Sequence, residues 1–315
     1  MDAKRIIVIG GPTACGKSKV AVDLALKIDG EIISADSMQV YKGMDIGTAK
    51  PDAGEMKGVR HYLIDEVYPC EEFSVAEFQK RASRAVETVL EAGKVPIVAG
   101  GTGFYINALV KGTEFVSQSD GRVIVPPPAG RPEELRERLR QVDPAAAEAI
   151  HPNNTRRAAR ALEYFLLTGE RISEHNARER ERAPVYDASV FILSAGRPAL
   201  YRRIEQRADR MIALGLLEEV RGLLDSGCGE GLTSMAGLGY KEMVRHLKHN
   251  MPMSAALELL KRNTRRFAKR QITWFKNQSP AHPPGKELWF DIDDYGNYSI
   301  IADRIAEIFL SQKSF

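Results

Sequence analysis

A glycine-rich loop near the start of the chain constrains the fold more than any other feature. It comprises Gly11, Pro12, Thr13, Ala14, Cys15, Gly16, Lys17 and Ser18, and it fits the P-loop pattern G-x4-G-K-[S/T]. A β-branched run at 6–9 precedes it, and a stretch with helical spacing of apolar residues follows at 20–28. Backbone N–H groups in such a loop close around an anion, and the helix N-terminus adds its dipole. The motif predicts a strand-loop-helix unit that binds a di- or triphosphate, as in ATP-binding proteins, without saying which one.

Two side chains of this loop are candidates for acting on bound phosphate. Lys17 supplies a positive charge, and the Ser18 hydroxyl is a ligand for Mg²⁺. A P-loop ATPase normally keeps an Asp at the end of a buried strand. The strand predicted at 95–99 ends without an acid, whereas the strand predicted at 31–34 is followed by Asp36. A carboxylate in that position lies in the ligand crevice of a parallel sheet, although an isolated Ser-x-Asp is more often a turn cap.

The order of predicted elements gives the fold class. Strands alternating with helices in the first 112 residues predict an α/β fold, a parallel sheet flanked by helices. The alternation stops at a connector rich in Gly, Pro and Ser, and strand signals return only at 190–193. We therefore predict a P-loop catalytic core, 1–112 and 185–315, interrupted by a helical insertion domain at 113–184. After the returning strand the pattern is helical, at 200–214, 216–224 and 255–276.

The charge distribution and the cysteine content indicate which kind of partner and which cellular compartment to expect. Basic and acidic residues number 14 and 15 in residues 1–112, but 31 and 27 in residues 113–315, so a polyanion should dock downstream. Three widely spaced cysteines predict neither a disulfide framework nor a zinc finger. The apolar run after Arg5 is too short for a signal peptide, and no run approaches a membrane span. We expect a cytoplasmic protein that has no membrane partner and acts as a monomer.

Several further motifs, in order and at fixed spacing, carry a resemblance that covers nearly the whole chain. Together with the glycine-rich loop, the chain resembles the tRNA dimethylallyltransferases, also called tRNA isopentenyltransferases, in their short bacterial form. The motifs are Ser34-Ala35-Asp36-Ser37-Met38-Gln39-Val40-Tyr41, residues 43–51, 100–105, 143–144, 150–153, 157–163, 203–207, 239–242 and 269–275.

The resemblance implies an activity. The family moves a dimethylallyl group from dimethylallyl diphosphate to N6 of the adenosine just 3′ of the anticodon in tRNA, with Mg²⁺ as cofactor. It implies that Asp36 is the general base, that Thr102 donates a hydrogen bond to a diphosphate oxygen and that Arg207 offers that group a cationic fork. By the same resemblance, Asp36, Ser37, Met38, Gln39 and Thr102 contact the target base. Without it, Thr102 is a turn residue and Arg207 a solvated charge.

Two basic runs are candidates for the RNA backbone. The insertion carries Arg156, Arg157 and Arg160 on one helical flank, where a solvated helix face is an equally good interpretation. Residues 261–276 hold seven cations and no acid, with aromatic residues at the end of the run, which favours RNA. The candidates there are Lys269, Arg270, Gln271, Thr273 and Trp274.

Other functions remain compatible with the sequence, and two features depart from the family pattern. An isopentenyltransferase of free adenine nucleotides would share the loop and Asp36 but would need neither basic segment. A P-loop kinase of a small metabolite and a non-enzymatic RNA-binding module are more distant, because no acid follows residue 99. Residues 115–130 depart from the family pattern, so contacts made there in relatives are not transferred. A thiol at Cys15 is also unusual: it is either a buried filler or a reactive group activated by the helix N-terminus.

Overall fold

The computed structural model describes residues 4–115, 132–281 and 286–311. It divides into two compact units, one formed by residues 1–112 and 184–315 and the other by residues 113–183. The atypical segment at 115–130 lies outside the described residues from position 116 onward.

A six-stranded sheet forms the centre of the first unit, in the order β3-β2-β4-β1-β5-β6. Every paired neighbour is parallel. The strands are β1 (Arg5–Gly10), β2 (Gly30–Ser34), β3 (His61–Tyr62), β4 (Val95–Ala99), β5 (Asp187–Ser194) and β6 (Leu288–Asp291). This confirms the predicted α/β class, a parallel sheet flanked by helices.

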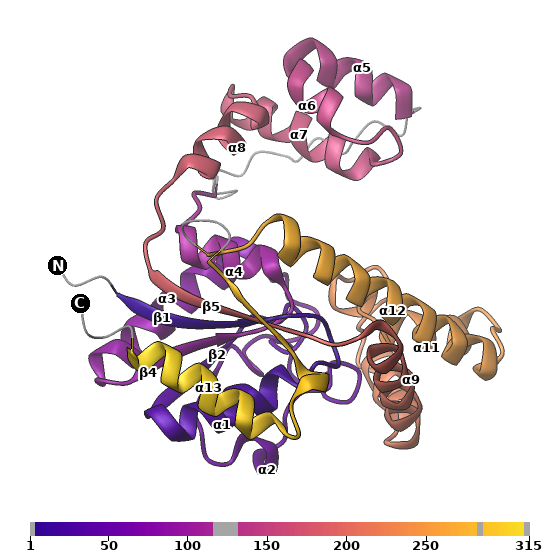
Figure 1. The fold of residues 1–315 in the computed structure, drawn as a ribbon. Coiled ribbons are helices and arrows are strands. Elements are labelled where there is room, and N and C mark those ends of the chain that lie inside the picture. The colour runs from indigo at the N-terminus through magenta and orange to yellow at the C-terminus, as the bar shows by residue number, and fades with distance from the viewer. Residues whose placement is uncertain (1–3, 116–131, 282–285, 312–315) are drawn as a thin grey trace. The chain divides into compact units, whose positions relative to one another are not determined.

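Both faces of the sheet are covered, because successive side chains of a strand point to opposite sides. Ile6 and Val8 of β1 pack with α3 (Val75–Glu91) and α4 (Gly103–Lys111). Ile7 and Ile9 pack instead with α1 (Lys17–Ile28) and α13 (Tyr298–Ser311). Figure 1 shows these two helix pairs on opposite sides of the strands. Unbroken apolar strands follow from this double burial.

The rest of the first unit is mostly helical. It contains α2 (Ala53–Met56), α9 (Arg197–Ala213), α10 (Leu216–Asp225), α11 (Tyr240–Lys248), α12 (Met253–Asn277) and the short 3-10 helices η1 (Ser234–Ala236) and η2 (Ile292–Asp294). The expectation that the chain stays helical after the returning strand is wrong at β6, which adds an edge strand beside β5. Leu288 and Trp289 of β6 are exposed, so this strand lacks the buried pattern that identifies a central one. β3 is only two residues long and was also not predicted.

The described part of the second unit consists of the helices α5 (Pro132–Val142), α6 (Pro144–Ala149), α7 (Thr155–Thr168) and α8 (Ile172–Glu181). Leu139, Ala147 and Leu162 contribute to a core of their own. Asp143 is buried and accepts hydrogen bonds from the backbone N–H of Ala146 at 3.0 Å and of Ser173 at 2.9 Å, which ties α6 to α8.

Within the ranges that the structure describes, no helix is both long enough and apolar enough to cross a membrane.

Candidate functional site

Three loops meet at the carboxyl edge of the sheet, after the adjacent strands β2, β4 and β1. Backbone hydrogen bonds continue beyond the strands. The Ala35 N–H donates to Ala99 O at 2.9 Å, and the Thr102 N–H donates to Ala35 O at 3.2 Å. The Gly100 N–H donates to Ile9 O at 3.1 Å. The topology therefore places the glycine-rich loop, the Asp36 segment and the Thr102 turn side by side, in the crevice where α/β proteins bind ligands.

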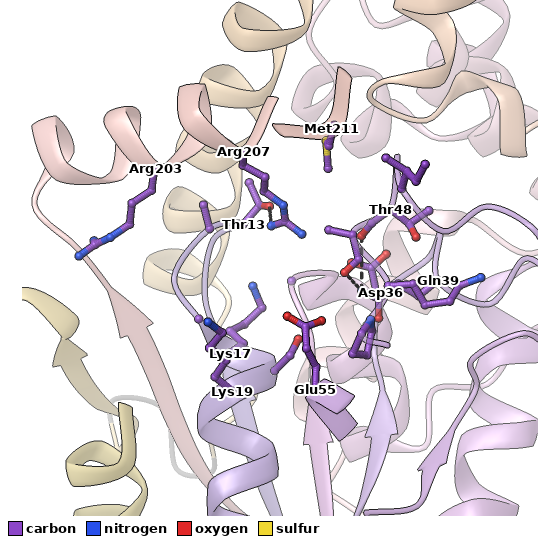
Figure 2. A pocket seen from close by; sticks show the side chains of 18 of the residues that line it. Thr13, Lys17, Lys19, Asp36, Gln39, Thr48, Glu55, Arg203, Arg207 and Met211 are labelled. Atoms are coloured by element: carbon purple, nitrogen blue, oxygen red, sulfur yellow. Dashed lines mark hydrogen bonds between the residues drawn. The ribbon is translucent and has the colours of Figure 1, made fainter. Parts of the chain in front are cut away.

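A cavity of about 680 Å³ opens at this edge, a volume in the range of small-molecule sites. Loop residues Thr13, Lys17 and Ser18 line one side, and Arg207 of α9 lines another. Figure 2 shows Asp36 and Glu55 directed into the space that Lys17 and Arg207 also face. The cavity thus joins cations suited to phosphate with a carboxylate suited to taking a proton.

Electrostatics couple Asp36 to both partly buried cations. Burial lowers the pKa of Lys17, and the negative charge of Asp36 opposes that change. Burial likewise lowers the pKa of Arg207, again opposed by Asp36 and, less strongly, by Glu55. The Lys17 ammonium donates to Pro12 O at 2.8 Å, and Arg207 Nη1 donates to Thr13 Oγ1 at 3.2 Å. Both cations therefore contact neighbouring residues of the glycine-rich loop, as an anion site requires.

One oxygen of Asp36 is engaged locally. Its Oδ1 accepts a hydrogen bond from the Met38 N–H at 2.9 Å, the turn-capping contact that an isolated Asp is expected to make. Thr102 Oγ1 accepts a hydrogen bond from the Ser37 N–H at 3.3 Å, so Thr102 lies against the same segment. Gln39 lines the cavity and donates from Nε2 to Ala49 O at 3.3 Å. Asp36 therefore combines a structural contact with a second oxygen that remains for chemistry.

Gln271 of α12 occupies a different environment from the RNA-facing position expected of it. Its side chain is only 7% exposed. Its Oε1 accepts from the Thr13 N–H at 2.9 Å, and its Nε2 donates to Gly101 O at 2.9 Å. The amide therefore braces the glycine-rich loop against the turn after β4, where its polar atoms are already satisfied.

Cys15 is a buried filler. Its side chain has no exposed surface, and burial raises the pKa of its thiol to about 11. The thiolate is therefore disfavoured, which supports the buried filler over the reactive thiol.

Several cavity residues were not singled out from the sequence. Arg203 and Arg210 lie on the same face of α9 as Arg207, a spacing of four and three residues that a search for cationic helix faces would find. The segment 45–51 forms another wall of the cavity; it belongs to the motif at 43–51 that the resemblance includes, although no role was assigned to its residues. Its position depends on Glu219 of α10, which accepts from the backbone N–H groups of residues 45, 46 and 47 at 2.9, 2.7 and 3.1 Å.

A second hollow, of about 500 Å³, lies along α12. It is lined by Arg266, Lys269, Arg270, Thr273, Trp274, Asn277 and Gln278. Trp274 lies so close to the start of α4 that a Cβ on Gly103 would approach its ring to 2.0 Å. The four expected RNA contacts at 269, 270, 273 and 274 thus share one surface, together with Arg266.

The other cations of α12 do not all face solvent. Lys261 Nζ pairs with Asp209 at 2.7 Å, and Arg265 Nη1 pairs with Glu205 at 2.6 Å. Both acids belong to α9. The run without acids along the sequence is therefore partly neutralised by a neighbouring helix, which periodicity within α12 does not reveal.

The insertion arginines lie on α7. Arg156, Arg157 and Arg160 are all exposed. Arg160 pairs with Glu163 of the same helix at 3.2 Å, an arrangement typical of a solvated helix face. RNA contact by these three arginines stays a prediction.

The oxygen chemistry of the cavity suits Mg²⁺. Ser18 is exposed at the N-terminus of α1 and lines the cavity, so its hydroxyl is accessible to a hard cation. Among the described residues, no group of three or more His, Cys, Asp or Glu side chains forms a metal cage. A cation here would depend on Ser18 together with phosphate oxygens, as Mg²⁺ commonly does.

Comparisons with known proteins all point to the same protein family. A family model described as IPP transferase matches residues 39–278. A tRNA dimethylallyltransferase of Pelotomaculum thermopropionicum is 47% identical over 306 residues, which cover 96% of this chain and 95% of that protein. The structure is similar to the tRNA isopentenylpyrophosphate transferase of Bacillus halodurans, with a TM-score of 0.73, 40% identity and coverage of 98% and 96%. It is also similar to a eukaryotic dimethylallyltransferase acting on tRNA, with a TM-score of 0.86, 29% identity and coverage of 98% and 80%.

Proposed function

The chain belongs to the IPP transferase family, that of the tRNA dimethylallyltransferases, and from this premise we propose how its cavity works. The protein transfers a dimethylallyl group from dimethylallyl diphosphate to N6 of the adenosine 3′ of the anticodon in tRNA and releases diphosphate. The observation that carries this proposal is the single cavity in which Asp36 faces Lys17 and Arg207 beside the glycine-rich loop. A carboxylate opposite an anion site is what alkyl transfer from a diphosphate to an amine requires.

The glycine-rich loop holds the diphosphate. Its backbone amides and the N-terminus of α1 surround the anion, while Lys17 and Arg207 neutralise charge as the allylic C–O bond breaks. Ser18 would hold Mg²⁺ against the same oxygens, and the ion would add positive charge at the leaving group. Thr102 Oγ1 accepts a hydrogen bond from the Ser37 N–H, so its own hydroxyl proton remains to be donated to a diphosphate oxygen.

Asp36 takes the proton. The adenine amine is a poor nucleophile because its lone pair is delocalised into the ring, so proton removal must accompany bond formation. As the new C–N bond forms and the C–O bond breaks, the N6 proton passes to the carboxylate oxygen that Met38 does not occupy. Electrons of the broken bond leave with the diphosphate. Ser37, Met38 and Gln39 form the rest of the base pocket.

The anticodon stem-loop docks on the basic surface of α12. Turning the target base out of its stack costs a few kcal/mol, which contacts to the RNA must offset. Lys269 and Arg270 offer charges to phosphates, and Trp274 offers a ring for stacking. Arg156, Arg157 and Arg160 supply further contacts from the insertion. We also propose that the protein acts as a monomer in the cytoplasm, where tRNA is available.

The alternatives drawn from the sequence gain no support. The two relatives align with 96% and 98% of the chain, and their names specify tRNA. No observation favours free adenine nucleotides, a small-metabolite kinase or a non-enzymatic RNA-binding module.

The test is an incorporation assay. The protein is incubated with labelled dimethylallyl diphosphate and Mg²⁺, without ATP, together with either unmodified tRNA or AMP. Label should enter tRNA alone, at a rate that added ATP does not increase. Label in AMP instead of tRNA, or a requirement for ATP hydrolysis, would contradict the proposal.

A further inference from the structure

Tyr298, the first residue of α13, lies directly against the glycine-rich loop. Gly16 has a φ of +75°, and a Cβ added there would lie 2.3 Å from Tyr298 Cε1 and 2.6 Å from Cζ. The ring therefore occupies the space above the Gly16 backbone, where no side chain fits. Tyr298 also lines the cavity, beside Lys17 and Ser18.

The hydroxyl-bearing edge of the Tyr298 ring faces the glycine-rich loop. Cζ, which carries the hydroxyl, would lie 2.6 Å from a Cβ at Gly16, and Gly16 precedes the first residue of α1, Lys17. Lys19 Nζ lies 5.9 Å from the ring centroid. Within the described parts of the chain the hydroxyl has no hydrogen-bond partner. A phenolic hydroxyl can donate to phosphate oxygen, so an unpaired donor at a phosphate-binding loop is suited to that role.

Hydrogen bonds and an ion pair hold the segment that leads into α13. The preceding residue, Asn297, accepts a hydrogen bond from the Ile300 N–H at 3.0 Å and so caps the start of α13. Upstream, Asp293 accepts from the Gly196 N–H at 3.1 Å and pairs with Arg203 at 2.6 Å. The hydrogen bond from Arg203 holds the pKa of Asp293 below its ordinary value, so this tie is ionised at neutral pH. Tyr298 is therefore presented by an anchored segment.

We infer that the Tyr298 hydroxyl donates a hydrogen bond to the diphosphate of the allylic donor, which makes Tyr298 a donor-binding residue. It lies beyond residues 39–278, the part of the chain that the family model matches. The inference rests on the proposed function, because it assigns a diphosphate to the glycine-rich loop. It gives the C-terminal segment a role in binding as well as in packing.

The test compares Tyr298→Phe with Tyr295→Phe in the full chain. Phenylalanine at 298 keeps the ring contact with Gly16 and removes only the hydroxyl. Tyr295 packs its ring on Phe290 at 5.9 Å and is not among the residues lining the cavity, so its variant is a matched control. Binding of dimethylallyl diphosphate in the presence of Mg²⁺ is measured by calorimetry, and melting temperatures are measured in parallel.

The inference predicts about 5-fold weaker donor binding for Tyr298→Phe, the effect of one lost hydrogen bond, with an unchanged melting temperature. The Tyr295→Phe control should bind like the wild type. Equal donor binding by Tyr298→Phe and wild type would overturn the inference and leave the ring a packing role. Failure of the wild type to bind the donor at all would instead refute the proposed function.

Discussion

The basic surface of α12 gives the sharpest prediction, because the structure separates its cations into two groups. Arg266, Lys269 and Arg270 line the hollow beside Trp274. Lys261 and Arg265 instead pair with acids of α9. Replacing the first group with alanine should weaken tRNA binding, whereas replacing the second should not.

The magnitude follows from counterion release. Each phosphate contact contributes about 0.7 to 0.9 to the slope of log affinity against log salt, so losing three contacts should flatten the slope by about 2 to 3. The Lys261→Ala, Arg265→Ala double variant should keep the slope. It should lose only the small stability of two partly exposed ion pairs, roughly 0.2–1 kcal/mol each.

The assay is tRNA affinity at several salt concentrations, together with the melting temperature and the affinity for dimethylallyl diphosphate. The donor should bind all variants equally, because it lies at the glycine-rich loop. If the double variant flattens the salt slope as much as the triple variant does, the assignment of the α12 cations to an RNA-binding group and an ion-paired group is wrong. If neither variant changes the slope, the RNA does not lie on α12.

Three further results are expected. Glu219→Gln should raise the KM for dimethylallyl diphosphate about 10-fold in steady-state kinetics, because the cavity wall loses the carboxylate that holds three of its backbone amides. The control, Glu218→Gln on the exposed side of α10, should behave like wild type. Gln271→Ala should lower the free energy of unfolding by about 1–3 kcal/mol, measured by urea denaturation, because it leaves two backbone groups unpaired; an unchanged value would show that water replaces the brace. At pH 8.5, iodoacetamide should modify the exposed Cys70 and leave Cys15, whose pKa is about 11, as the thiol; rapid mass-spectrometric labelling of Cys15 in the folded protein would contradict its burial.

The sequence was sufficient where local pattern and topology determine the outcome. The glycine-rich loop follows a buried strand, and Asp36 follows another. Parallel strands bring such ends together, so their meeting in one cavity was predictable. The sheet and its flanking helices were predictable for the same reason.

Contacts between distant parts of the chain were not predictable. Gln271 reaches the loop across 258 residues of sequence, and its motif suggested RNA contact. Arg265 appears solvated along its own helix, yet it meets Glu205 from α9. The edge strand β6 has two exposed apolar residues and no buried alternation. Each depends on which elements become neighbours in space, and a single sequence does not state that.

The Asp36→Asn variant tests most directly whether Asp36 is the general base. The variant keeps an oxygen that can accept from the Met38 N–H, so the local fold should persist. It removes the base, and single-turnover transfer of dimethylallyl to tRNA should slow by about two orders of magnitude or more. Affinities for tRNA and for dimethylallyl diphosphate, measured on the same preparation, should stay within about 2-fold of wild type. A transfer rate near that of the wild type would show that Asp36 does not take the proton.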